Sequence, residues 1–82
     1  MRKPISGTTA YTDPNGLSHR EIEVLILIVR GLTNKEIADH LCIGTTTVIS
    51  HRKNIMEKLN VRSVSGLTIY AVMNGYIEAD RI

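Results

Sequence analysis

The signature of a helix start occurs three times between Leu17 and Val48, and this repetition restricts the fold more than any other feature. "LSHREI" and "LTNKEI" each place a Ser or Thr just before an expected helix and a Glu three residues later. This pattern is the capping box, and the apolar residues on either side of it add a hydrophobic staple. "IGTTTV" repeats the staple with Gly in the capping position. Three helix starts are therefore encoded locally.

The expected ends of the helices are also clear. Gly31, Asn60 and the pair Asn74-Gly75 follow helical segments and readily adopt the backbone conformation found at helix C-termini. The sequence therefore predicts an all-α bundle with helices at 19–30, 34–41, 45–59 and 64–74, of which the third is the longest. The apolar run "EVLILIV" is also compatible with a buried strand. The flanking cap signals favour a helix that is buried on nearly all sides.

The core of this domain is expected to be aliphatic, because the chain contains no Trp or Phe. Its 82 residues suffice for one small domain, which buries about 60% of the surface of its unfolded chain. The predicted core residues are Ile22, Leu25, Ile28, Ile37, Leu41, Val48, Ile55, Leu59, Leu67 and Ala71.

The first 16 residues differ from the rest in composition. They contain both prolines and consist mostly of small or polar residues, which is typical of a flexible N-terminal tail or linker. The sequence Asp13-Pro14-Asn15-Gly16 at the end of this stretch is a turn signal. We therefore expect a tail over residues 1–16 and a folded domain over residues 17–82.

Several classes of protein are excluded by what the sequence lacks. One cysteine, Cys42, cannot form an intramolecular disulfide and suits a reducing compartment. The longest apolar run, 24–29, is too short to span a membrane, and the N-terminus lacks the apolar segment of a signal peptide, so a cytoplasmic protein without membrane contact is expected. No cofactor, small-molecule ligand or enzyme activity is predicted, because no nucleophile–base grouping or phosphate-binding glycine loop occurs.

His40, Cys42 and His51 do not form a metal site in this interpretation, because their spacing matches no zinc pattern. Cys42 is instead expected to be a small buried residue of the turn.

The second and third helices are separated by residues 42–44 alone. A short helix, a turn of about three residues with Gly, and a longer helix form the helix-turn-helix arrangement. In the third helix Val48, Ile55 and Leu59 share the face toward the core. The opposite face carries the residues Thr46, Ile49, Ser50, Lys53 and Glu57. This second face is too polar for a core and has too few charges for a surface that serves only solubility.

The charge of the chain favours a polyanion as the partner of this helix. Residues 45–62 carry four Lys or Arg against one Glu, whereas acidic residues exceed basic ones by one in residues 17–44. A helix fits the major groove of DNA, and the N–H groups at its N-terminus attract phosphate. Ile49, Ser50 and Lys53 would then face base edges, and His51 and Arg52 would lie toward a DNA strand. The alternative is a set of capping threonines on a solvated face.

"LSHREIEVLILIVRGLTNKEIADHLCIGTTTVISHRKNIMEKLNV", followed by "GLTIYAVMNGYI", strongly resembles the LuxR-type (GerE, FixJ/NarL) helix-turn-helix domain of bacterial transcription regulators. The resemblance covers about residues 17–77. It implies four helices that bind double-stranded DNA, commonly as the output domain of a response regulator, and a homodimer formed through the fourth helix. RNA polymerase is a further candidate partner.

The resemblance also assigns roles to individual positions. It implies base contacts by Ile49, Ser50 and Lys53. The phosphate contacts it implies, together with those expected from the helix itself, fall on Lys35, Thr46, Thr47, His51 and Arg52. The dimer surface is expected at the apolar residues of the fourth helix that do not face the core, Val64, Ile69 and Val72.

Three positions depart from the family pattern. The family usually has Lys or Arg where this chain has Ile49, often Ser in place of Gly44 and often Arg in place of Val64. The exposed apolar Ile49 leaves a second hypothesis open, in which the helix-turn-helix unit binds another regulatory protein instead of DNA.

Overall fold

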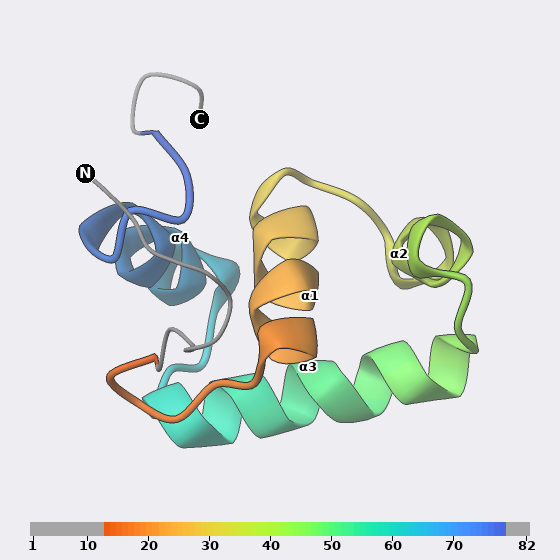
Figure 1. Ribbon diagram of the computed structural model, residues 1–82, viewed down its shortest axis with the longest axis horizontal. Helices are drawn as coiled ribbons and strands as arrows, with labels where there is room; N and C mark the ends of the chain where they lie inside the picture. Colours follow the sequence, from red (N-terminus) through yellow and green to blue (C-terminus); the bar gives the residue numbers. More distant parts are fainter. Residues whose placement is uncertain (1–12, 79–82) are drawn as a thin grey trace, which may run out of the picture.

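The computed structural model describes residues 13–78, which form four α-helices and no strand (Figure 1). They are α1 (His19–Val29), α2 (Asn34–Leu41), α3 (Thr45–Leu59) and α4 (Val64–Met73). The predicted all-α helix-turn-helix fold is confirmed. Helices α1 and α4 end one residue earlier than predicted, because Arg30 and Asn74 are the C-caps.

Both predicted capping boxes are present. The Ser18 hydroxyl accepts a hydrogen bond from the backbone N–H of Glu21 at 3.1 Å, and the Glu21 carboxylate accepts one from the N–H of Ser18 at 2.9 Å. Thr33 and Glu36 repeat the arrangement at 3.1 and 2.8 Å. Asn60, the C-cap of α3, has the left-handed conformation at φ 56°. Local signals therefore determine where most of these helices begin and end.

Helix α2 ends at Leu41, as predicted, but the residue that caps it was not identified from the sequence. Cys42 is its C-cap and adopts a left-handed conformation at φ 59°, which is uncommon for a residue with a side chain at Cβ. The expectation that Cys42 is buried is wrong, because its side chain is exposed at the surface of the turn. The turn directs the side chain outward, while the neighbouring Ile43 packs against the core.

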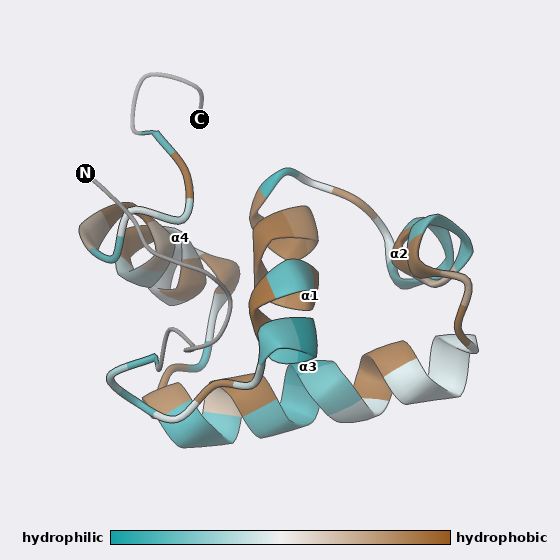
Figure 2. Cartoon of the chain, viewed as in Figure 1, coloured by the Kyte–Doolittle hydropathy of each residue, from teal (hydrophilic) through white to brown (hydrophobic). Residues whose placement is uncertain are grey.

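Helix α1 lies between α2 and α4, and α3 runs across one end of α1 (Figure 1). Helix α1 packs against each of the other three helices, and α2 packs against α3. Figure 2 shows the hydrophobic turns of α1 inside this arrangement and a mainly hydrophilic middle part of α3. Helix α1 is therefore the central helix, as predicted.

Seven of the ten predicted core residues are buried. These are Leu25, Ile28, Ile37, Val48, Ile55, Leu67 and Ala71. The prediction is wrong for Ile22, Leu41 and Leu59, which are only partly buried and pack on the margin of the core. Leu17, Val24, Leu27 and Ala38 are additional core residues. The apolar run in α1 has no polar side, so its periodicity could not indicate which residues lie deepest.

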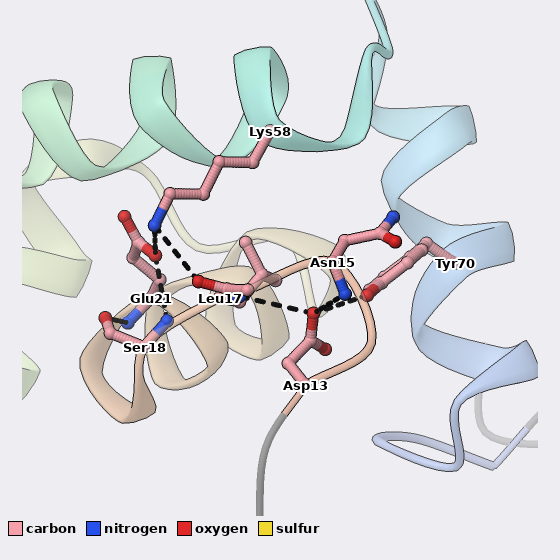
Figure 3. Close-up of polar contacts among 8 residues, drawn as sticks. Asp13, Asn15, Leu17, Ser18, Glu21, Lys58 and Tyr70 are labelled. Atoms are coloured by element: carbon pink, nitrogen blue, oxygen red, sulfur yellow. Dashed lines mark hydrogen bonds and ion pairs between the residues drawn. The ribbon is translucent and has the colours of Figure 1, made fainter.

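The residues that lead into α1 form a hydrogen-bonded part of the structure, which we call the leading segment (residues 13–17; Figure 3). The side chain of Asp13, from the stretch expected to be a tail, is buried. Its carboxylate accepts hydrogen bonds from the backbone N–H groups of Asn15 and Leu17 at 2.9 and 3.3 Å, and from the hydroxyl of Tyr70 at 2.7 Å. The hydroxyl of Tyr76 donates to its other oxygen. The division of the chain at residue 16 stays a prediction.

A second group of polar contacts joins the leading segment to α3. Lys58 donates to the Glu21 carboxylate at 2.7 Å and to the backbone carbonyl of Gly16 at 3.2 Å (Figure 3). Glu21 is buried, so its charge has this partner in place of water. The helix start at Ser18 is thereby attached to the C-terminal half of α3.

Two buried carboxylates are held ionised by these contacts. Burial alone raises the pKa of Asp13, but the hydrogen bonds from Tyr76, Tyr70 and two backbone N–H groups outweigh it, and the pKa lies below its ordinary value of 3.8. Burial also raises the pKa of Glu21, and the bonds from Lys58 and Ser18 lower it below 4.5. Their stabilising contribution is full above these ordinary values and is lost as the pH falls through the lower values in the fold.

Two further features of residues 13–78 bear on function. None of the four helices combines the length and apolar character that a membrane crossing needs. Within the same residues there is no group of three or more His, Cys, Asp or Glu side chains that could hold a metal ion.

Candidate nucleic-acid interface

The three side chains predicted to face DNA bases lie on one exposed side of α3. Ile49, Ser50 and Lys53 are all exposed, and the large apolar side chain of Ile49 is 51% accessible. Val48 and Ile55 on the opposite side are fully buried. Burial of one side against α1 and α2 therefore fixes which side of α3 is presented to a partner.

The N-terminus of α3 differs from that of the other helices in the described part of the chain. Ser18, Thr33 and Ser63 each accept a hydrogen bond from a backbone N–H of the helix they precede, whereas Gly44 makes no side-chain cap to α3. The exposed Thr46 and Thr47 stand beside these N–H groups. A phosphate could therefore accept hydrogen bonds there without displacing a capping side chain.

The other residues predicted to contact phosphates lie on the first turn of α2 and on the second turn of α3, in different environments. Lys35 on α2 is exposed, and its ammonium lies 3.8 Å from the Asp39 carboxylate. Such an exposed pair is weak and leaves the ammonium available to another anion. Arg52 is half-buried and donates a hydrogen bond to the Asn34 side chain at 3.4 Å, which links α3 to the first turn of α2. His51 is also half-buried.

The basic charge of residues 45–62 is not all directed to one surface. Lys58 is bound to Glu21, so its charge is partly neutralised within the fold. The exposed cation on the base-facing side of α3 is Lys53, one turn after Ile49. The sequence alone could not distinguish Lys58, which is bound within the fold, from Lys53, which is exposed, because Glu21 lies 37 positions from Lys58 in the chain.

Helix α4 presents a second apolar surface. Ile69 is 60% exposed and Val64 is 40% exposed, whereas Val72 is half-buried. Met73 is 79% exposed and was missed by the sequence prediction, although it lies four residues after Ile69 on the same side of a helix. We call Ile69, Val72 and Met73, which lie within about 100° of one another around the helix, the α4 apolar face; Val64 in the first turn lies outside it.

These features define a helix-turn-helix domain whose second helix, α3, has a buried and an exposed side. The chain belongs to the family described as "Bacterial regulatory proteins, luxR family", whose model matches residues 15–71. It is thus a DNA-binding domain of the kind used in bacterial transcription regulation, which confirms the family and the general function predicted from the sequence.

Individual relatives support the assignment. The chain is 50% identical over 56 residues to the response regulatory protein YgeK of Escherichia coli (strain K12), covering 68% of this chain and 38% of that protein. It is 48% identical over 56 residues to the oxygen regulatory protein NreC of Staphylococcus carnosus (strain TM300), covering 68% and 26%. The solved structure of the response regulator StyR matches with a TM-score of 0.64 and 52% identity, covering 71% of this chain and 29% of that chain.

These relatives are considerably longer than the matched region. The chain spans 26% to 38% of the length of the two curated relatives named above. The similarity therefore concerns the helix-turn-helix domain and not the remaining parts of those proteins.

Proposed function

We propose that this domain binds double-stranded DNA with α3 in the major groove and regulates transcription as the output domain of a response regulator. The observation that carries the proposal is the exposed side of α3, which combines an uncapped helix start with Ile49, Ser50 and Lys53. A helix can enter the major groove and bring such side chains to base edges. YgeK and StyR are both described as response regulators, which supports the proposed context.

Within this proposal, two sets of residues have different tasks. The N–H groups at the start of α3 hold a phosphate, assisted by Thr46 and Thr47, while Lys35 and His51 contact the same backbone region. Arg52 orders the interface through its bond to Asn34 and adds positive charge. Ile49, Ser50 and Lys53 then discriminate among base pairs. Phosphate contacts set the orientation of the domain, and base contacts set its sequence preference.

We further propose that two copies pair through the α4 apolar face on a double site. Exposed apolar side chains gathered on one helix favour an interface, and a symmetric pair places two α3 helices on neighbouring half-sites about one helical turn apart. The bacterial cytoplasm is the expected compartment, and RNA polymerase is a further proposed partner. A domain of this size contacts few phosphates, so dimer formation would add substantially to specific affinity.

One observation favours a second function, in which α3 binds a regulatory protein. Ile49 is an exposed apolar residue in the centre of the proposed DNA surface. A band-shift titration with unrelated duplex at low salt separates the two functions. DNA binding requires a complex that weakens as salt is raised, because phosphate contacts release counterions. The absence of a complex at low salt would favour the protein-binding function.

Replacement of Lys35 by Ala should weaken binding to specific and random duplexes by a similar factor. Its ammonium is assigned to a phosphate, which is present at every site, so the slope of log affinity against log salt should fall by about 1. Fluorescence anisotropy at several salt concentrations measures this slope. The matched control is Arg30→Ala, which removes an exposed cation from the C-terminal end of α1 and should leave the slope unchanged. A changed sequence preference in the Lys35 variant would contradict the phosphate assignment.

Replacement of Ile69 by Glu should lower cooperative occupancy of a paired site while an isolated half-site is bound as before. The side chain is exposed, so a carboxylate is tolerated in the monomer but would be unfavourable in an apolar interface. Val72→Glu is a less specific test of the interface, because Val72 is half-buried and a carboxylate there would also destabilise the fold. Footprinting on single and paired half-sites gives both affinities. Equal loss on both sites would indicate unfolding, and no loss on either would place the dimer surface elsewhere.

A further inference from the structure

Helices α3 and α4 have little direct contact with each other, although both would have to be correctly oriented in a DNA-bound pair. Helix α4 packs on α1, and α3 packs on α1 and α2. In Figure 1 the two helices meet only around the connection that leads from the C-terminal end of α3 into α4. The orientation of the α4 apolar face relative to α3 must therefore be set largely by other parts of the fold.

The connection itself fixes the first turn of α4. A Cβ atom at Gly66 would lie 3.0 Å from the Cβ of Val61, so the connection and the helix are in close contact at this point. Ser63 caps the same turn through the backbone N–H of Gly66. These contacts hold the beginning of α4 and do not reach its C-terminal end, where Met73 lies.

The leading segment holds the other end. The hydroxyl of Tyr70, in the last turns of α4, donates to the buried Asp13 carboxylate at 2.7 Å, and the hydroxyl of Tyr76, just beyond α4, donates to its second oxygen. Three residues after Asp13, the carbonyl of Gly16 accepts a hydrogen bond from Lys58 of α3. Figure 3 shows part of this arrangement, with Lys58 approaching the segment from α3 and Tyr70 from α4.

We propose that Asp13 is a positioning residue for DNA recognition, which holds the C-terminal half of α4 at a fixed orientation relative to α3. It acts through Tyr70 and Tyr76 on one side and through the Gly16–Lys58 contact on the other. The inference rests on the proposed function, because it assigns Asp13 a part in spacing two half-sites. A charged acceptor that is 2% exposed and receives four hydrogen bonds defines a single geometry, since each donor left unpaired there would be costly.

The structural part of the inference can be tested without DNA. Spin labels on Cys residues introduced at Asn54 of α3 and Met73 of α4, in a Cys42→Ser background, report the distance between the two helices by pulsed electron resonance. Both positions are exposed, and dilution with unlabelled protein suppresses distances between copies. The Asp13→Asn and Tyr76→Phe variants should each broaden the distance distribution. Identical distributions in the wild type and both variants would overturn the inference, whether or not the domain binds DNA.

The functional part uses the ratio of paired-site to single-site affinity. Asp13→Asn and Tyr76→Phe should reduce this coupling by about fivefold or more and leave half-site affinity within about twofold. Thr33→Ala is the control, because it removes the cap of α2 and should lower thermal stability without touching Asp13, the tyrosines or the Gly16–Lys58 contact. The control variant should keep the wild-type ratio of paired-site to single-site affinity, although its loss of thermal stability is similar to that of the Asp13 and Tyr76 variants. Unchanged coupling in the Asp13 and Tyr76 variants would mean that Asp13 has a purely structural role and would overturn the inference. Absence of DNA binding by the wild type would instead reject the proposed function.

Discussion

Replacement of Leu25 by Ala is expected to lower the free energy of unfolding by about 2–5 kcal/mol, the largest effect of any single change considered for this domain. Leu25 is fully buried in α1, the helix on which the other three pack. Truncation removes three carbon atoms from the core and leaves a cavity that a four-helix domain of this size can only partly close. Because small domains have marginal stability, a loss of this size would unfold much of the population near physiological temperature.

Urea denaturation followed by circular dichroism measures this effect. Ile69→Ala is the control, because that side chain is 60% exposed on α4 and its truncation should change stability by less than about 0.5 kcal/mol. Similar small losses for both variants would mean that α1 is not the central helix of the core. A change in the slope of the urea transition would instead point to an altered denatured state.

Replacement of Ile49 by Lys is expected to shift the preferred base pair opposite this position toward G·C by about 1–3 kcal/mol. Isoleucine has no hydrogen-bond donor, but it can pack against the C5-methyl group of thymine, whereas a lysine can donate to the O6 and N7 of guanine. Ile49 is exposed in the middle of the proposed base-facing side, so the change should not disturb the core. The wild-type site should accordingly carry A·T pairs opposite Ile49 and a guanine within reach of Lys53.

Selection of bound sequences from a random duplex library, for wild type and variant in parallel, measures this shift. Ile49→Ala is the matched control, since it shortens the side chain without adding a donor and should mainly relax the thymine preference. Uracil in place of thymine removes only the methyl group from the DNA. If no uracil replacement weakened the wild type more than it weakened Ile49→Ala, the proposed contact between Ile49 and thymine would be wrong.

The local signals in the sequence were sufficient for most of the fold. Ser18, Thr33 and Asn60 act through residues within four positions of themselves, so the limits of the helices could be read directly. The exposed side of α3 could also be predicted, because Val48 and Ile55 mark the opposite side by their spacing. The resemblance to the LuxR-type domain and the helical periodicity agreed at these positions.

Contacts between distant parts of the chain could not be predicted in the same way. The hydrogen bond that the Asp13 carboxylate accepts from the Asn15 N–H is a common local turn motif. The contacts of Asp13 with Tyr70 and Tyr76, in contrast, join residues 57 and 63 positions apart. Lys58 was counted with the basic residues of α3, although it is bound to Glu21 in the fold. The exposure of Cys42 follows from a left-handed turn that its residue type did not indicate.

The most direct measurement of the central claim, that the exposed side of α3 is the DNA-binding surface, is a backbone amide nuclear magnetic resonance titration of the domain with short duplex DNA. Binding through α3 predicts the largest chemical-shift changes at Thr46, Thr47, Ile49, Ser50 and Lys53, with a smaller set at Lys35, and their loss when salt is raised. Changes confined to α4, or an unperturbed α3 at low salt, would contradict it.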